Sequence, residues 1–199
     1  MIDAMSKSVT FGFDEAFIRG TGVGQPLGIL NAPATISVAK ESGQAADTIV
    51  FENIVNMWSR LAPSLVNDAI WIVNPEALPQ LLTMSFPTGA ANGTPLFLPS
   101  QAIADKHAGS IFGRPLFFSE KASAIGDQGD LILVAPSQYI IGLRLDAAFA
   151  RSNAPGFMSD VENFRLVTRA EGLPAMNSAI TPRYGTNTLS YACVLDDRA

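Results

Sequence analysis

The chain has 199 residues, of which 48% are hydrophobic and 16% are charged, and its formal net charge at pH 7 is −5. An acidic chain with scattered lysines does not match a dedicated nucleic-acid-binding protein, which needs a basic stripe to displace counterions. Its single cysteine, Cys193, excludes an internal disulfide and a zinc site built from thiolates. Average chains carry about 25% charged residues, so this composition favours a protein that covers part of its surface with a partner.

A glycine-rich turn is the first clear feature along the chain. Before it, residues 14–18 (Asp-Glu-Ala-Phe-Ile) favour the end of a helix. Glycine readily adopts positive φ, so the turn predicts a sharply folded connection between two elements. The turn residues are Gly20, Gly22, Gly24, Pro26 and Gly28.

Apolar residues recur with helical spacing over residues 48–61, which predicts a helix. Thr48 is the expected N-cap, and Pro63 limits the far end. The side chains expected on the buried face are those of Ile54, Val55, Trp58, Leu61 and Leu65.

A strand and a second helix are expected next. Residues 69–73 are continuously apolar, which predicts a strand buried on both faces. Asn74 is a good N-cap and Pro75 a good first helical residue, so a helix should start there. Pro79 is unfavourable inside a helix and delays the expected start. The inner face would consist of Leu78, Leu81 and Leu82.

Strand patterns dominate the second half of the chain. Residues 131–135 and 139–145 predict a strand pair joined around Pro136, and residues 164–169 favour a further strand. Residues 111–118 predict a turn that leads into a strand. The alternation over the last strand places these residues on one side: Leu189, Tyr191, Cys193 and Leu195.

The order of these elements indicates the fold class. Strands outnumber helices and do not alternate regularly with them, which predicts an α+β fold with a mixed sheet and flanking helices. The longest apolar runs fall far short of the ~20 residues that a membrane helix needs, and no signal peptide begins the chain, so we expect a soluble protein.

Residues 85–100 form a long loop rich in Pro, Gly, Asn and Thr. Loops beyond about 12–15 residues are uncommon in compact domains and tend to be functional or mobile. The residues that mark this loop are Pro87, Gly89, Gly93 and Pro95.

Enzymatic chemistry finds little support in the sequence. The glycine turn lacks the third glycine of a dinucleotide-binding fingerprint, because Gln25 or Leu27 occupies its position. His107 is the only histidine, so neither a multi-histidine metal site nor a histidine triad is well supplied. Residues 127–130 lack the later ligands of a calcium loop and predict a turn. We therefore expect no enzyme, no catalytic residue, no metal and no cofactor.

Charges on the strand at 164–169 have two interpretations. The period of two places Arg165, Val167 and Arg169 on one face, together with Glu171. The row could be a solvated strand face, or it could be a row of charges between subunits, since arginine is enriched at interfaces. The sequence leaves both open.

Taken together, these segments resemble the C-terminal portion of the tailed-phage major capsid proteins, which have the Hong Kong 97 phage fold. The resemblance follows the chain in order and covers nearly all of it. The stretches that carry it are residues 16–30, 70–75, 112–116, 129–130, 140–144, 164–165, 169–172 and 185–195.

The resemblance implies a shell subunit with an axial and a peripheral domain. Residues 1–30 would be a peripheral segment and the end of the spine helix, residues 31–160 mostly axial domain, and residues 161–199 a return through the peripheral domain into the axial domain. The loop at 85–100 would lie near the capsomer axis. The partners would be copies of the chain in pentamers or hexamers, with packaged DNA contacted only indirectly and no membrane. The location would be the virion capsid, and the host cytoplasm before assembly.

The sequence departs from that family in two respects. Thr21 stands where the family usually has an acidic residue. Family members also carry an N-terminal arm, an extended loop and most of the spine helix ahead of the glycine turn, so we expect a truncated subunit that folds, closes no shell alone, and could be a monomer. The alternatives are an encapsulin-like nanocompartment shell protein, a small ligand- or protein-binding α+β module, and a small enzyme.

Overall fold

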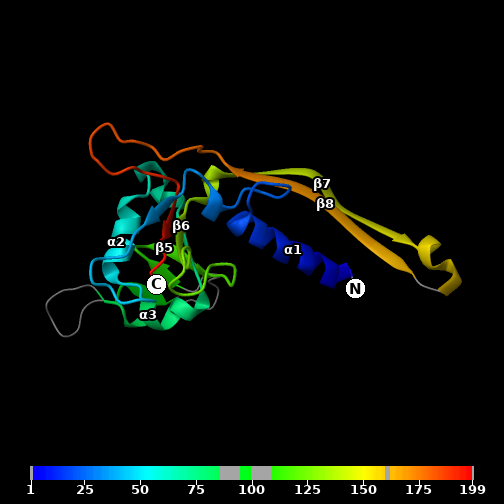
Figure 1. The fold of residues 1–199 in the computed structure, drawn as a ribbon, viewed down its shortest axis with the longest axis horizontal. Coiled ribbons are helices and arrows are strands. Elements are labelled where there is room, and N and C mark those ends of the chain that lie inside the picture. The colour runs from blue at the N-terminus through cyan, green and yellow to red at the C-terminus, as the bar shows by residue number, and fades with distance from the viewer. Residues whose placement is uncertain (1, 86–94, 100–108, 160–161, 199) are drawn as a thin grey trace.

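The computed structural model describes residues 2–85, 95–99, 109–159 and 162–198. Within them, a body built on one large sheet carries a long two-stranded ribbon that projects away from it, and a helix lies alongside the ribbon (Figure 1). The C-terminus lies in the body, whereas the N-terminal helix runs outward beneath the ribbon.

The elements follow the chain in this order. The α-helices are α1 (Ile2–Arg19), α2 (Phe51–Ser59) and α3 (Leu78–Thr83). The short 3-10 helices are η1 (Ile29–Asn31), η2 (Pro63–Asp68), η3 (Pro75–Ala77), η4 (Pro136–Gln138) and η5 (Ala154–Ser159). The strands are β1 (Ile36–Val38), β2 (Ile70–Val73), β3 (Phe97–Pro99), β4 (Gly109–Ile111), β5 (Arg114–Phe118), β6 (Leu131–Val134), β7 (Tyr139–Ser152), β8 (Asn163–Pro174) and β9 (Ala192–Leu195).

The body sheet is mixed. Its described strands number seven, in the order β1-β9-β6-β2-β5-β4-β3. The pairs β1/β9 and β2/β5 are parallel, and the other neighbours are antiparallel. A two-residue turn at Phe112 and Gly113, both with positive φ, joins β4 to β5 as tight hairpins require. The predicted α+β fold with a mixed sheet is confirmed.

The larger hydrophobic core lies between one face of this sheet and the helices α2 and α3. Trp71 of β2 is fully buried there, and its indole nitrogen donates a hydrogen bond to the Ile111 carbonyl oxygen at 3.2 Å. Ile54 and Met57 of α2 and Leu81 of α3 are also completely buried in this core. The helices predicted at 48–61 and after Asn74 are therefore confirmed as the cover of one sheet face.

The opposite sheet face has a smaller core. Val134, Ala192 and Val194 are buried against Ile18 of α1 and Ile29 of η1. The cover of β2 is incomplete: Ile70 and Ile72 pack against this core but stay half-buried, whereas Trp71 and Val73 are fully buried. The prediction of a strand buried on both faces was wrong for β2, because only the C-terminal end of α1, at Ile18, packs on this face.

Details of both predicted helices differ from expectation. Thr48 is not the N-cap of α2: the helix begins at Phe51, and the Asn53 side chain accepts a hydrogen bond from the Val50 backbone nitrogen at 3.0 Å. Val55 and Leu82 were expected on the buried faces of these helices but are exposed, because each lies on the side of its helix that faces solvent.

Two strand predictions also need correction. Residues 131–135 and 139–145 do not pair, because β6 already has β2 and β9 as its neighbours and η4 redirects the chain into β7. Near the C-terminus, Tyr191 packs in the smaller core while Cys193 and Leu195 pack in the larger one. The predicted alternation between the two sides therefore holds within β9 but does not extend back to Tyr191.

None of the described helices is both long enough and apolar enough to cross a membrane.

Candidate functional site

The ribbon formed by β7 and β8 is the most unusual feature of the described structure. Its register runs from Tyr139 opposite Pro174 to Ser152 opposite Asn163, and two irregularities interrupt β7 between Leu143 and Ala148. An isolated two-stranded unit is at best marginally stable in water, so this one needs other surfaces to support it.

The base of the ribbon is anchored to the glycine turn. The Leu27 nitrogen donates to the Gly172 carbonyl oxygen at 2.8 Å, and the Tyr139 hydroxyl donates to the Leu27 carbonyl oxygen at 2.9 Å. Phe17 of α1 meets the Tyr139 ring edge-on, with centroids 5.8 Å apart. These contacts join α1, the turn and both strands of the ribbon at one point.

The glycine turn is packed too tightly for side chains at two positions. A Cβ on Gly20 would lie 2.1 Å from the Pro26 carbonyl oxygen, and one on Gly28 would lie 2.4 Å from the Gly20 nitrogen. Gly22 and Gly24 instead have φ of 79° and 69°, which favours glycine for backbone reasons. Pro26 is buried. The structure thus places all five predicted turn residues in one compact connection.

Tyr139 provides a pH-dependent test of this junction. Burial, followed by the nearby Tyr191 and Glu171 groups, raises the pKa of Tyr139 to about 12 from a usual value of about 10. The folded state therefore holds the phenol proton more tightly than the unfolded state does. This contribution to stability is fully present below pH ~10 and is lost as the pH rises toward ~12.

We expect Tyr139→Phe to remove this part of the alkaline destabilisation, and to cost about 1 kcal/mol at neutral pH through the lost hydrogen bond to Leu27. Urea unfolding of both proteins at pH 8, 10 and 11.5 would measure it. The difference in unfolding free energy between them should shrink as the pH rises, and a constant difference would contradict the assignment.

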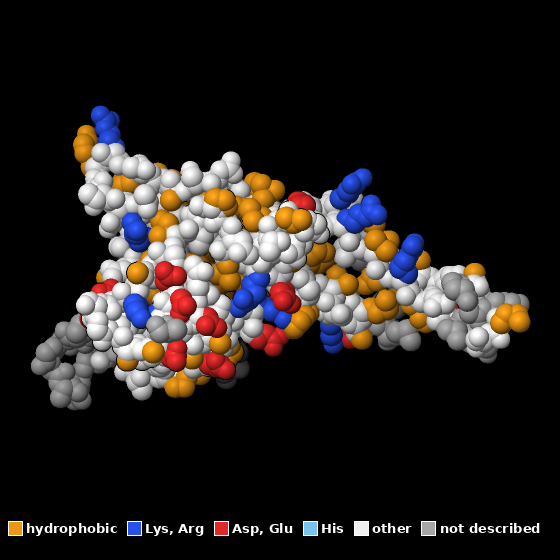
Figure 2. All heavy atoms as spheres, viewed as in Figure 1, with side chains coloured by type: hydrophobic (Ala, Val, Ile, Leu, Met, Phe, Trp, Pro, Cys, Tyr) orange, Lys and Arg blue, Asp and Glu red, His pale blue; other side chains and the backbone are white. Residues whose placement is uncertain are grey.

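The predicted arginine row lies on the exposed face of the ribbon. Arg165, Arg169 and Glu171 are exposed, whereas Phe164, Leu166 and Thr168 on the alternate face are half-buried. In the described part of the chain, neither Arg165 nor Arg169 makes an ion pair. Figure 2 shows basic side chains standing out from the ribbon. The structure thus brings Arg165, Arg169 and Glu171 together on one exposed face.

Large apolar side chains are exposed on the same ribbon. Leu143 is 67% exposed, and hydrophobic side chains run along the ribbon in Figure 2. A monomeric protein seldom exposes so many apolar residues in one element, so they indicate a surface for another molecule. Both faces of the ribbon contribute, because the register places Leu143 opposite Ala170 but Leu145 opposite Arg169. We call this set the apolar ribbon surface: Ile140, Ile141, Leu143, Leu145, Phe149 and Leu173.

The remaining predicted residues lie elsewhere. The Asn74 side chain accepts a hydrogen bond from the Glu76 nitrogen at 3.0 Å and donates one to the Ala122 carbonyl oxygen at 3.1 Å, with Pro75 next in η3. Pro95 is exposed and bridges to Ser85. The other predicted loop residues, together with His107, fall outside the described residues: Pro87, Gly89 and Gly93.

Comparison with known families decides the class of this ribbon-bearing fold. The model of the phage capsid family matches residues 1–183, which include α1, the glycine turn and the whole ribbon. The chain belongs to the phage capsid family. The resemblance seen in the sequence is thereby confirmed. No curated protein sequence matches this chain.

Solved structures support the fold of this capsid-family chain. It is similar to the capsid of an empty GTA particle, computed with C5 symmetry, with a TM-score of 0.68 and 16% identity. It is also similar to the capsid of a native GTA particle, likewise computed with C5 symmetry, with a TM-score of 0.71 and 17% identity. Both matches cover 100% of this chain but only 65% and 64% of those chains.

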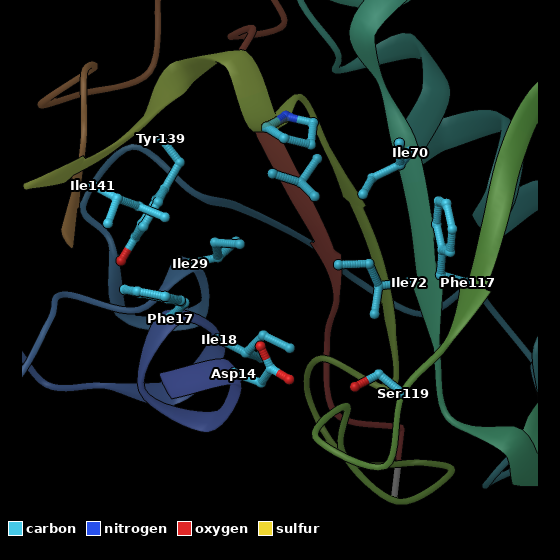
Figure 3. Close-up of a pocket in the computed structure, with 12 residues that line it drawn as sticks. Asp14, Phe17, Ile18, Ile29, Ile70, Ile72, Phe117, Ser119, Tyr139 and Ile141 are labelled. Carbon is cyan, nitrogen blue, oxygen red and sulfur yellow. The ribbon is translucent and has the colours of Figure 1, made fainter. Parts of the chain in front are cut away.

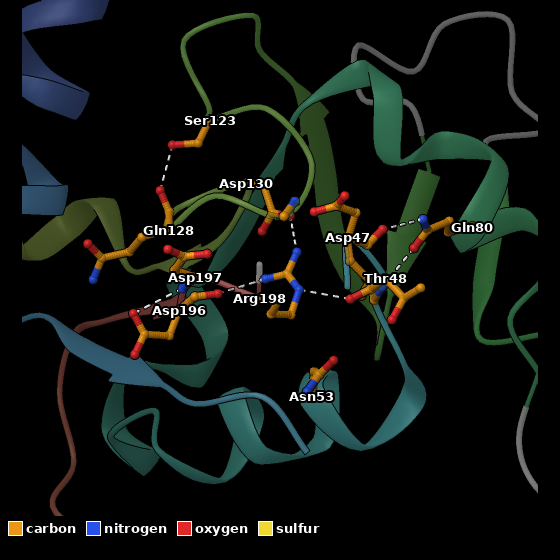
Figure 4. Close-up of polar contacts among 12 residues, drawn as sticks. Asp47, Thr48, Asn53, Gln80, Ser123, Gln128, Asp130, Asp196, Asp197 and Arg198 are labelled. Carbon is orange, nitrogen blue, oxygen red and sulfur yellow. Dashed lines mark hydrogen bonds and ion pairs between the residues drawn. The ribbon is translucent and has the colours of Figure 1, made fainter. Parts of the chain in front are cut away.

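Sequence reasoning missed the buried ion pair of this capsid-family chain. Arg198, one residue from the C-terminal Ala199, and Asp130, just before β6, have no exposed side-chain surface and contact each other directly (Figure 4). Arg198 also donates to the Thr48 carbonyl oxygen at 2.8 Å. The sequence predicts only a turn at residues 127–130, which include Asp130. Nothing local marks residues 68 positions apart as partners.

Reactive groups are poorly placed for chemistry in the described part of the chain. No cluster of three or more metal-ligating side chains occurs there. Cys193 is fully buried in β9, and burial raises the pKa of its thiol to about 12. A thiol with that pKa carries almost no thiolate at neutral pH and is a poor nucleophile.

Proposed function

We propose that this protein is a structural subunit that associates with copies of itself to form a phage-type shell. Membership of the phage capsid family and the capsid structures that share its fold support this proposal. The chain spans less than two thirds of the length of those capsid chains.

The apolar ribbon surface is the single observation that carries the proposal. The ribbon projects from the body, so its exposed leucines (Leu143, Leu145 and Leu173) lie on an open surface and not in a concave pocket for a small ligand. A long, two-stranded projection is instead suited to lying across a neighbouring subunit, where burial of its apolar side chains would stabilise both the contact and the ribbon.

We assign α1, the glycine turn and the ribbon to the peripheral domain, and the seven-stranded body sheet to the axial domain. Residues 1–30 and the return from residue 161 keep the roles implied by the family. We also assign β7 to the peripheral domain, although residues 31–160 were expected to be mostly axial. The reason is that β7 pairs with β8 and not with the body sheet.

The same proposal gives the partners and location. The partners are further copies in five- or six-membered rings, and packaged DNA is contacted only indirectly, since the chain is acidic overall. We infer no catalytic role, because the family forms shells. The location is the virion capsid, and the host cytoplasm before assembly.

Replacing Leu143 with glutamate tests the proposal. Wild-type protein should show faster-sedimenting species as its concentration rises in sedimentation velocity. Leu143→Glu should need at least about thirtyfold higher concentration to associate, because a charge replaces an apolar contact at the centre of an interface.

Leu82→Glu is the matched control. Leu82 is 52% exposed on α3, which lies on the body and away from the ribbon. The Leu82→Glu variant should therefore associate like wild type. If wild-type protein stays monomeric at all concentrations, or if Leu143→Glu associates as wild type does, the apolar ribbon surface is not the interface.

A further inference from the structure

A second apolar surface lies on the body, where the cover of the smaller core ends. It is a groove of about 610 Å³ between α1, the half-buried side of β2 and β5, and the base of the ribbon (Figure 3). Ile70 and Ile72 form its floor and Phe117 stands beside them. Phe17 and Ile141 line the opposite wall.

The mouth of the groove is polar. Asp14 of α1 and Ser119 face each other across it in Figure 3. The Asp14 side chain is exposed and makes no ion pair among the described residues. A suitable occupant therefore has an apolar or aromatic end and a cation beside it.

The loop at residues 181–188 presents such a pair. Tyr184 is 85% exposed, and the Arg183 guanidinium carbon lies 5.5 Å from the centroid of its ring. Two backbone hydrogen bonds between Ile180 and Leu189, of 2.7 and 2.8 Å, hold the base of the loop. The loop extends from the end of the molecule opposite the ribbon tip (Figure 1).

We propose that Tyr184 of one copy inserts into this groove of a second copy, with Arg183 pairing with Asp14. The tyrosine ring would pack on Ile72, and the guanidinium would reach the carboxylate at the mouth. This inference rests on the proposed function, because it supplies the contact between neighbouring subunits that a shell needs.

Two features of the surfaces favour a second copy as the occupant. Loop and groove are complementary in charge and in polarity, and tyrosine and arginine are enriched among the residues that contribute most binding energy at the centres of protein interfaces. The two surfaces also differ from each other, so the contact is head-to-tail. Repeated head-to-tail contacts close into rings when the rotation allows, as a capsomer requires.

Disulfide trapping between two variant chains tests the contact directly. A chain carrying Tyr184→Cys is mixed with a differently tagged chain carrying Ile72→Cys, and both are oxidised mildly. The buried Cys193 does not compete. We expect a disulfide-linked heterodimer on a non-reducing gel. The control replaces Tyr184→Cys by Val23→Cys, another loop residue that is 85% exposed. Heterodimer yields no higher than with Val23→Cys would overturn the proposal.

Charge exchange gives an independent readout. Arg183→Asp and Asp14→Arg should each weaken association at least tenfold in sedimentation velocity, and the two changes on one chain should restore it. If both variants associate like wild type, the docking is wrong while the proposed function stands. If wild-type protein does not associate and the Tyr184→Cys and Ile72→Cys chains do not cross-link, both are wrong.

Discussion

Replacing Arg198 with alanine is expected to lower the free energy of unfolding by about 3–5 kcal/mol. The guanidinium bonds to the Asp130 carboxylate and to two carbonyl oxygens, those of Thr48 and Asp196. Neither Arg198 nor Asp130 exposes any side-chain surface. The alanine variant leaves a buried carboxylate without its cation, which is the costly case.

The position of Arg198 adds to this effect. Its backbone nitrogen donates to the Gly126 carbonyl oxygen at 2.7 Å, and the Gly126 nitrogen donates to Asp130 at 3.0 Å. The C-terminal residues thus tie the turn before β6 to the segment before α2 (Figure 4). Removing the side chain should loosen both segments together.

Urea unfolding of three variants compares the contribution of the buried ion pair with that of an exposed ion pair. Arg151→Ala breaks an ion pair with Glu162 whose side chains are 67% and 45% exposed, and should cost less than about 1 kcal/mol. The double variant Arg198→Met with Asp130→Ala should be less destabilised than Arg198→Ala, because no charge stays buried. An Arg198→Ala effect no larger than that of Arg151→Ala would refute the account.

Gly28→Ala is the second large expected effect, a destabilisation of about 3 kcal/mol. Gly28 has φ of −68°, which alanine adopts without strain, so the obstacle is purely steric. The added methyl group would lie 2.6 Å from the Ile18 carbonyl oxygen and 2.7 Å from the Arg19 nitrogen. These are backbone atoms at the end of α1, so the whole junction with the ribbon must shift.

Gly12→Ala is the matched control for this prediction. Gly12 lies within α1, and a Cβ there would meet no atom within 4 Å. The variant should be more stable than wild type by about 0.5–1 kcal/mol, because alanine loses less backbone entropy in a helix. Thermal unfolding of both variants checks the contrast, and a Gly28→Ala variant as stable as Gly12→Ala would show that the turn is not tightly packed.

Much of the body could be predicted from the sequence. The apolar run at β2 and the start of the next helix at Asn74 depend on side-chain types within a few positions, and both appear in the structure. The alternation over β8 likewise predicted that Arg165, Arg169 and Glu171 share an exposed face, although Val167 of the same row is half-buried. In each case the periodicity of one segment determines the answer.

The errors arose where segments compete for partners. β6 and β7 are adjacent in sequence, yet β6 pairs with β2 and β9 while β7 pairs with β8. The cover of β2 could not be predicted either, because it depends on where the end of α1 and the base of the ribbon pack against the sheet. Such outcomes depend on the packing of distant elements, which no local pattern records.

The sequence by itself therefore determined the α+β class, the glycine turn and the family of this protein. Only the tertiary structure decided that the ribbon stands apart from the body, that Asp130 and Arg198 meet, and that an apolar groove opens beside Asp14. The physical reason is range: backbone preference acts over a few residues, whereas burial and charge pairing depend on which surfaces the whole chain brings together.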